Sequence, residues 1–232
     1  MKKGLFVTLE GGEGVGKSTQ IKLLKEALIE AGCEVVDTND PGGTLIGLKI
    51  RTILKDNENK ALMPKTELLL FLAARAQLVE EIIIPSLKKN KIVISDRYYH
   101  STFAYQGWAR GLSIIDIRQL NEFAIDGIKP DITFILDLPP QKGFDRMNIK
   151  VDKVKEISKN QIALQIHLPP ELPRLSKDRI EEAGEKFHEK VQQAFLQLAA
   201  EEPERIVVLD AARPVEEIAD EIKRKVLEKL KA

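Results

Sequence analysis

A glycine-rich run near the start of the chain constrains its fold more than any other stretch. Residues Glu10 to Ser18 read EGGEGVGKS and satisfy the spacing G-x-x-x-x-G-K-[ST]. The apolar run before it, Gly4 to Leu9, predicts a buried strand. The segment after it predicts a helix over Thr19 to Ala31, whose apolar face carries Ile21, Leu24, Leu28 and Ala31. This order of strand, glycine-rich loop and helix predicts a P-loop.

A P-loop binds nucleotide phosphates mainly through its backbone. Glycines bring N–H groups close to phosphate oxygens because no Cβ intervenes, and the helix N-terminus adds the positive end of its dipole. The Lys17 ammonium can reach the β- and γ-phosphates, and the Ser18 hydroxyl can ligate Mg²⁺. We therefore expect an ATP site made by Gly11, Gly12, Glu13, Gly14, Val15, Gly16, Lys17, Ser18 and Thr19.

Composition narrows the class of protein around this site. The chain has 232 residues with 36 basic and 36 acidic side chains, so no net field attracts nucleic acid or an anionic membrane. The single cysteine, Cys33, excludes an internal disulfide and a cysteine-based metal cage. No apolar run approaches membrane-spanning length, and Met1-Lys2-Lys3 runs directly into a strand, leaving no room for a signal peptide. We expect a cytoplasmic protein without nucleic-acid or membrane partners.

Strand and helix patterns alternate along the whole chain. Four more apolar runs predict strands, at residues 33–37, 91–95, 131–138 and 205–210. Helices are expected after the capping residue Thr44, from Pro64 as a long and largely buried helix, and at residues 113–126, 178–200 and 214–230. This alternation predicts an α/β fold, with a doubly wound five-stranded parallel sheet in a single domain over residues 1–232.

One segment, residues 141–177, departs from this pattern. It is rich in lysine, then alternates like an exposed strand, and ends in three prolines that break regular structure, Pro169, Pro170 and Pro173. Such a composition favours a mobile lid over the nucleotide site.

Three arginines predict a second anion site beside the P-loop. Arg51, Arg75 and Arg97 each follow a turn or lie beside a strand end on the carboxyl side of the sheet, where ligands bind in open parallel sheets. Guanidinium groups gathered around one pocket repel one another unless an anion neutralises them. A phosphate monoester fits best, because its oxygens match the guanidinium fork.

Aromatic and polar side chains near these arginines suggest how the rest of the phosphate monoester, the acceptor of a transferred phosphate, is bound. Phe71 and Arg75 are four residues apart on one helix, which suits a base held by ring stacking and a donor to a carbonyl oxygen. Tyr105 and Gln106 offer a wall and an amide near the sugar. A carboxylate at Glu13 is unfavourable beside a triphosphate unless it faces a sugar hydroxyl or a cation, so we assign it to the sugar of the acceptor.

Taken together, these segments resemble the bacterial type of thymidylate kinase, in the nucleoside-monophosphate kinase group of P-loop proteins. The matching segments are Glu10 to Gln20, Asp40-Pro41-Gly42-Gly43-Thr44 with Arg51, Glu67 to Gln77, Asp96-Arg97-Tyr98, Ser101-Thr102 with Ala104-Tyr105-Gln106-Gly107, Asp178-Arg179-Ile180-Glu181 and Leu209-Asp210-Ala211. They span nearly the whole chain in family order. The resemblance implies transfer of the γ-phosphate of ATP to dTMP, giving dTDP and ADP for dTTP synthesis, with Mg²⁺ as cofactor and a homodimer as the assembly.

The resemblance also implies roles for individual residues. Phe71 would stack on thymine, Arg75 would bond its ring oxygen, Tyr105 would crowd the sugar 2′ position, and Glu13 would bond the 3′-hydroxyl. The implied dTMP site is Glu13, Asp40, Arg51, Phe71, Arg75, Arg97, Ser101, Thr102, Tyr105 and Gln106. Ser18 and Asp96 would hold the metal. The implied catalytic residues are Lys17, Arg97 and a lid arginine, for which Arg174 and Arg179 are preferred to Arg146.

Two departures from the family pattern affect these roles. Asn39 stands where the family usually has an arginine, so phosphate binding would depend more on Arg51 and Arg97. The lid is longer than usual, with residues 147–173 lacking a counterpart. The P-loop alone would also fit another nucleotide or nucleoside kinase, or a non-kinase ATPase switch.

Overall fold

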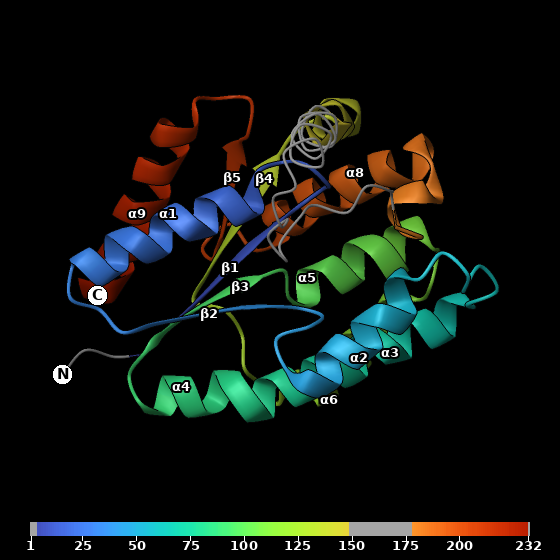
Figure 1. Cartoon of the computed structure of the whole chain (residues 1–232), viewed down its shortest axis with the longest axis horizontal. Helices are drawn as coiled ribbons and strands as arrows, with labels where there is room; N and C mark the ends of the chain where they lie inside the picture. Colours follow the sequence, from blue (N-terminus) through green and yellow to red (C-terminus); the bar gives the residue numbers. More distant parts are fainter. Residues whose placement is uncertain (1–3, 149–177, 232) are drawn as a thin grey trace, which may run out of the picture.

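The computed structural model describes residues 4–148 and 178–231, and its centre is a five-stranded sheet with helices on both faces (Figure 1). Every neighbouring pair of strands is parallel, in the order β2-β3-β1-β4-β5. The strands are β1 (Leu5–Gly11), β2 (Val35–Asn39), β3 (Ile92–Asp96), β4 (Ile132–Asp137) and β5 (Ile206–Asp210). The predicted five-stranded parallel sheet is confirmed.

The central strand β1 divides the core in two, because its successive side chains point to opposite faces of the sheet. Phe6 packs into one cluster, whereas Leu5, Val7 and Leu9 pack into the other. The cluster around Val7 is covered by α1 (Lys17–Glu30) and α9 (Val215–Lys231). The cluster around Phe6 is covered by α3 (Pro64–Leu78), α5 (Tyr99–Thr102), the π-helical η2 (Phe103–Ala109), α6 (Ile114–Ile125) and α8 (Glu185–Glu201).

The long helix expected from Pro64 is present but not uniform. After α3 the chain makes a π-helical turn, η1 (Val79–Ile83), and continues as α4 (Ile84–Lys88). Pro85 explains the change, since it lacks an N–H and its ring would clash with the carbonyl four residues earlier in a regular helix. The helix α2 (Leu45–Lys55) begins as predicted at Thr44, whose hydroxyl accepts a hydrogen bond of 2.9 Å from the Gly47 N–H.

Several predicted boundaries and burials were wrong. Strand β2 begins two residues later than expected, and residues 140–148 are helical where irregular chain was predicted. Gly184, with φ +92°, separates the short 3₁₀ turn η3 (Glu181–Ala183) from α8, so the helix predicted from residue 178 begins at Glu185. Ala31, expected on the apolar face of the first helix, is exposed, and so is Leu69 in the helix from Pro64 that was expected to be largely buried. The remainder of the predicted lid, residues 149–177, lies outside the described residues.

Within residues 4–148 and 178–231, no helix combines the length and apolar character that crossing a membrane requires.

The packing of α9 on α1 gives a direct test of the core. Replacing Ile222, which is fully buried, by alanine should lower the free energy of unfolding by about 2–4 kcal/mol through lost burial and a cavity. Urea unfolding followed by circular dichroism measures this change. Val215→Ala, at the exposed start of the same helix, serves as the control and should change stability by less than about 0.5 kcal/mol. Equal losses in both variants would contradict the assigned packing.

Candidate active site

The carboxyl ends of the central strands open into a cavity of about 320 Å³. It brings the predicted phosphate loop and the predicted acceptor residues together in one place. The predicted residues that line it are Glu13, Gly14, Val15, Gly16, Lys17, Ser18, Thr19, Asp40, Arg51, Phe71, Arg75, Asp96, Arg97, Ser101, Thr102, Tyr105 and Gln106. Gly11 and Gly12 lie beside it and supply carbonyl groups to the residues described below.

Sequence reasoning did not select some residues that line the cavity. These are Pro41, Lys55, Met147, Asp178 and Ile180, and the lining also includes Asn39, noted above only as a departure from the family pattern. Lys55 and Asp178 form an ion pair with a Nζ–Oδ2 distance of 2.5 Å, which joins the end of α2 to the segment that resumes at residue 178. Asp178 and Ile180 belong to a motif that carried the family resemblance, so that signal could have found them. Nothing in the sequence near Lys55 marks it.

The loop between β1 and α1 has the backbone shape that close phosphate approach requires. Gly16, with φ +105°, lies at the N-cap of α1, and the unpaired N–H groups of the first helical turn are available to a phosphate held in the loop. At Gly11, with φ +130°, a Cβ would lie 2.5 Å from the Leu136 carbonyl oxygen. The Lys17 ammonium donates to the Gly12 oxygen at 2.7 Å. Burial lowers the pKa of Lys17, and the nearby Arg97 guanidinium lowers it further.

Arg97 lies at the centre of the polar network and is paired with a P-loop carboxylate. Its guanidinium donates to Glu13 Oε1 at 2.6 Å, to the Gly11 carbonyl at 2.9 Å and to the Ser101 hydroxyl at 3.2 Å. The Tyr105 hydroxyl also donates to Glu13 Oε1, at 3.0 Å. Burial alone would raise the pKa of Glu13, but Arg97 and Lys17 hold it at about 2. Glu13 therefore faces a cation. This is one of the two partners, a sugar hydroxyl or a cation, that we expected for a carboxylate beside a triphosphate.

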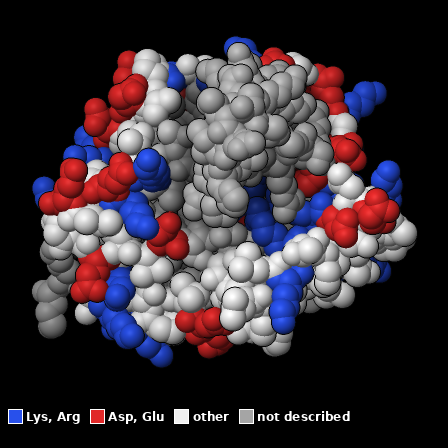
Figure 2. Space-filling model, in the orientation of Figure 1, with Lys and Arg blue, Asp and Glu red and all other residues white. Residues whose placement is uncertain are grey.

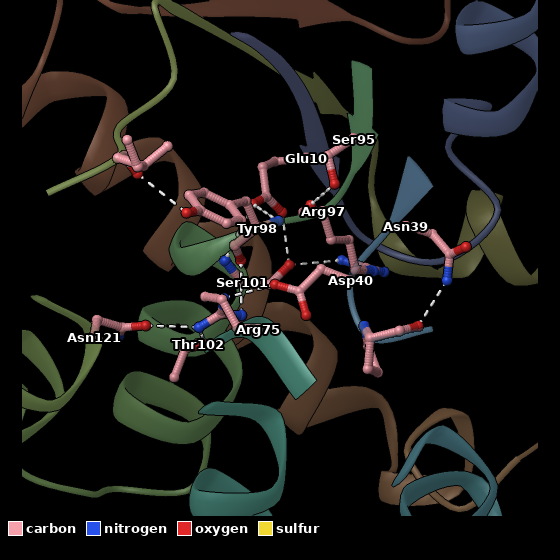
Figure 3. A network of polar contacts seen from close by, with 12 residues as sticks. Glu10, Asn39, Asp40, Arg75, Ser95, Arg97, Tyr98, Ser101, Thr102 and Asn121 are labelled. Carbon is pink, nitrogen blue, oxygen red and sulfur yellow. Dashed lines mark hydrogen bonds and ion pairs between the residues drawn. The ribbon is translucent and has the colours of Figure 1, made fainter. Parts of the chain in front are cut away.

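Glu10, at the end of β1, supports the segment that carries Arg97 (Figure 3). Its carboxylate accepts hydrogen bonds from the Tyr98 N–H at 2.8 Å and from the Ser101 hydroxyl at 2.6 Å. Its burial raises its pKa to about 7, although Arg97 and these hydrogen bonds act in the opposite direction. Glu10 thus fixes the turn after β3, with Arg97 itself in a left-handed conformation at φ +69°.

Arg75 is buried and joins three parts of the fold (Figure 3). Its Nε donates to Asp40 Oδ2 at 2.6 Å, and one terminal nitrogen donates to Thr102 Oγ1 and Asn121 Oδ1, each at 2.6 Å. The other terminal nitrogen donates to the Tyr98 carbonyl at 3.2 Å. A guanidinium has five N–H groups, and these four bonds leave one for a ligand. Phe71, one turn earlier on α3, is half-buried and lines the same cavity.

Charges in the cavity are largely balanced, which alters one of our expectations. Figure 2 shows Lys and Arg side chains in the hollow near the middle of this face. The basic residues among the described lining are Lys17, Arg51, Lys55, Arg75 and Arg97, and the acidic ones are Glu13, Asp40, Asp96 and Asp178. A phosphate monoester was expected to neutralise the three arginines, but two of them already have a carboxylate of the chain as partner, Asp40 for Arg75 and Glu13 for Arg97. Arg51 and Asn39 both donate to the Pro41 carbonyl, at 2.7 Å each.

Ser18 and Asp96 were predicted to hold a metal ion, and the structure fits that role. Both side chains line the cavity, with Asp96 at the end of β3 beside the P-loop. Asp96 Oδ1 is buried without a hydrogen-bond partner among the described residues. A carboxylate oxygen and a hydroxyl are ligands that Mg²⁺ prefers.

The arginines considered for the lid lie in different places. Arg179 donates to Glu67 Oε2 at 2.5 Å and to the Leu54 carbonyl at 3.0 Å, and it is not among the described residues that line the cavity. Arg146 donates to the Ala211 carbonyl at 3.0 Å. Arg174 lies outside the described residues.

Comparisons with known proteins agree with this arrangement. The thymidylate kinase family model matches residues 9–168 of the chain. The thymidylate kinase of Herpetosiphon aurantiacus is 42% identical over 94% of this chain and 93% of its own length. That of Geotalea uraniireducens is 42% identical over 98% of both chains. The crystal structure of thymidylate kinase from Ehrlichia chaffeensis aligns with a TM-score of 0.70 and 32% identity, covering 97% of this chain and 99% of that one. By sequence and by structure, this chain belongs to the thymidylate kinase family.

Proposed function

We propose that this protein transfers the γ-phosphoryl group of ATP to dTMP, giving ADP and dTDP, a step in dTTP synthesis. The observation that carries the proposal is that the P-loop, Phe71 and Arg75 all line one cavity. The names of the relatives, which are thymidylate kinases, support the same reaction.

The residues of the cavity suit phosphoryl transfer, which depends mainly on alignment and charge neutralisation. An oxygen of the dTMP phosphate forms a bond to the γ-phosphorus while the bond to the β,γ-bridging oxygen breaks, and ADP leaves. Lys17 would neutralise the transferring oxygens, and Arg97 and Arg51 would hold the acceptor phosphate. That phosphate is largely ionised near neutral pH, so the reaction needs no general base.

The cofactor and the base would be held by the remaining residues. Ser18 and Asp96 would hold Mg²⁺, which neutralises charge on the phosphate oxygens when it is bound. Phe71 would stack on thymine, and the remaining N–H of Arg75 would donate to a ring carbonyl oxygen. Glu13, held by Arg97, would accept from the sugar 3′-hydroxyl beside Tyr105. Because ATP and Mg²⁺ are cytoplasmic reactants, we propose that the protein works in the cytoplasm.

A panel of acceptors tests the proposed reaction. ADP release from ATP and Mg²⁺ should be fastest with dTMP and much slower with dCMP, dGMP, UMP and thymidine, since thymidine has no phosphate for Arg51 and Arg97. A coupled ADP assay measures the rates. Activity with thymidine alone would indicate a nucleoside kinase, and hydrolysis of ATP without any acceptor would indicate an ATPase switch.

Arg97 should be essential for turnover. Arg97→Ala removes a cation that contacts Glu13 and that would neutralise the acceptor phosphate in the proposed reaction, so kcat/KM for dTMP should fall by roughly 10³-fold or more. Steady-state kinetics on folded protein, checked by circular dichroism, measures the loss. Arg224→Ala, which removes an exposed arginine paired with Glu228 on α9, is the control and should leave kcat/KM unchanged. Near-normal activity of Arg97→Ala would exclude Arg97 from the site.

We also propose that two copies of the chain form a homodimer through the helices α2, α3 and α6, which lie side by side (Figure 1). These helices carry large apolar side chains that are exposed, with Leu45 78% and Phe123 89% accessible. The others are Ile46, Leu48, Ile53, Leu69 and Ile115. Exposed apolar side chains on adjacent elements mark interfaces.

A charge on one of these helices should disrupt the dimer. Leu69→Glu should convert a particle of two chains to one chain, as measured by size-exclusion chromatography with light scattering, because it would bury an unpaired carboxylate. Ile29→Glu is a matched control, since Ile29 on α1 is exposed to a similar extent, 51% against 56% for Leu69. A wild-type protein that is monomeric at micromolar concentration would refute the proposal.

A further inference from the structure

A buried carboxylate outside the cavity accepts a hydrogen bond from a side chain that lines it. Glu67, in the first turn of α3, is 1% exposed and is not among the described residues that line the cavity. Its Oε1 accepts from the Gln106 side-chain amide at 2.9 Å. Gln106, on η2, is itself 2% exposed but does line the cavity, one turn beyond Thr102. Among the described residues that donate hydrogen bonds to the Glu67 side chain, Gln106 is the one that lines the cavity.

The charge around Glu67 fixes which end of the Gln106 amide it holds. Arg110 donates to both oxygens of Glu67, at 3.2 and 3.3 Å, and Arg179 donates to Oε2 at 2.5 Å. Burial alone would raise the pKa of Glu67, but Gln106 and the two arginines lower it, so the group is ionised at neutral pH. An ionised carboxylate only accepts hydrogen bonds, and hence the NH₂ group of Gln106 must face it.

We propose that Glu67 sets the base preference of this site by orienting the Gln106 amide, so that its Oε1 faces the cavity as an acceptor. The inference rests on the proposed function and names the feature of the base that the site selects. Thymine and uracil carry an N–H at ring position 3, which donates to such an acceptor. Cytosine carries a lone pair there, so its N3 would face the Gln106 oxygen without a hydrogen. Glu67 is thus a positioning residue for base selection.

Glu67→Gln tests the proposal with little change of shape. Two arginine N–H groups donate to Oε2, one of them at 2.5 Å, whereas only the longer Arg110 Nε bond of 3.2 Å reaches Oε1. The oxygen of the new amide should therefore occupy the Oε2 position, and its NH₂ group should face Gln106. Gln106 then has to rotate and accept with Oε1, which turns its NH₂ group toward the cavity. A mispaired buried hydrogen bond costs about tenfold or more in affinity. The ratio of dTMP to dCMP dissociation constants should therefore shift at least tenfold toward dCMP by isothermal titration calorimetry.

Three comparisons distinguish a change in the orientation of the Gln106 amide from general damage to the site. The dTMP to dUMP ratio should stay unchanged in Glu67→Gln, because both bases have an N–H at position 3. Glu81→Gln is a matched control variant, since Glu81 also accepts from a glutamine, Gln77 at 2.8 Å, but at the exposed surface. It should leave all three affinities unchanged. Adding Glu67→Gln to Gln106→Met should give no further change in the dTMP to dCMP ratio, because the amide it acts through is absent.

A measurement on the wild-type protein keeps the proposal testable if Glu67→Gln fails to fold. The side-chain NH₂ signals of Gln106, assigned by their loss in Gln106→Met, should exchange slowly with solvent before and after dTMP is added. Rapid exchange in the free protein, or an unchanged dTMP to dCMP ratio in folded Glu67→Gln, would overturn the role of Glu67. Failure of the wild-type protein to bind dTMP would instead overturn the proposed function.

Discussion

The ion pair between Asp40 and Arg75 is the interaction on which the acceptor side of the cavity depends. Both side chains are almost fully buried, and Asp40 Oδ1 has no hydrogen-bond partner among the described residues. Burial raises the pKa of Asp40 even though Arg75 opposes the change. Losing either partner would leave a buried charge unpaired, which is far more destabilising than the pair itself is stabilising. Because Arg75 also binds Thr102 and Asn121, the end of β2, α5 and α6 hold their positions together.

Paired charges also fix the side chains on the phosphate-binding side of the cavity. Arg97 reaches a carboxylate of the P-loop, Glu13, and the backbone of the segment that carries Arg97 is held by Glu10 from the neighbouring strand. These groups come from β1 and the turn after β3, which lie next to each other in the sheet. Cations that would repel one another are thereby fixed before any phosphate enters. Such preorganisation lets charge in the reacting groups be stabilised without rearrangement of the protein.

The sequence predicted the fold and most of the residues that line the cavity, because strand and helix patterns and the P-loop motif are local. Alternating strands and helices give a parallel sheet, and the carboxyl-end rule placed Asp96 near Lys17. Partners within the cavity depend on contacts distant in sequence, such as Arg97 with Glu13, 84 residues apart, so the sequence could not assign which carboxylate pairs with which arginine. The sequence predicted the helix after Thr44 but could not show that its apolar side chains Leu45 and Leu48 are exposed. The break at Gly184 reflects one residue's backbone freedom, which the helical pattern around it concealed.

Because the backbone at Arg97 is left-handed, folding stability and activity favour different residues at this position. A side chain with a Cβ is strained at φ +69°, at a cost of about 1–2 kcal/mol, and the bond from the Arg97 N–H to the Leu9 carbonyl holds it there. Glycine would relieve that strain but would remove the guanidinium. In a library randomised at this position, selection for folded protein alone should enrich glycine. Selection for growth that depends on the activity of the enzyme should instead retain arginine. The two selections would then give different residue frequencies at position 97. The size of that difference would measure how much stability is given up at this position for activity.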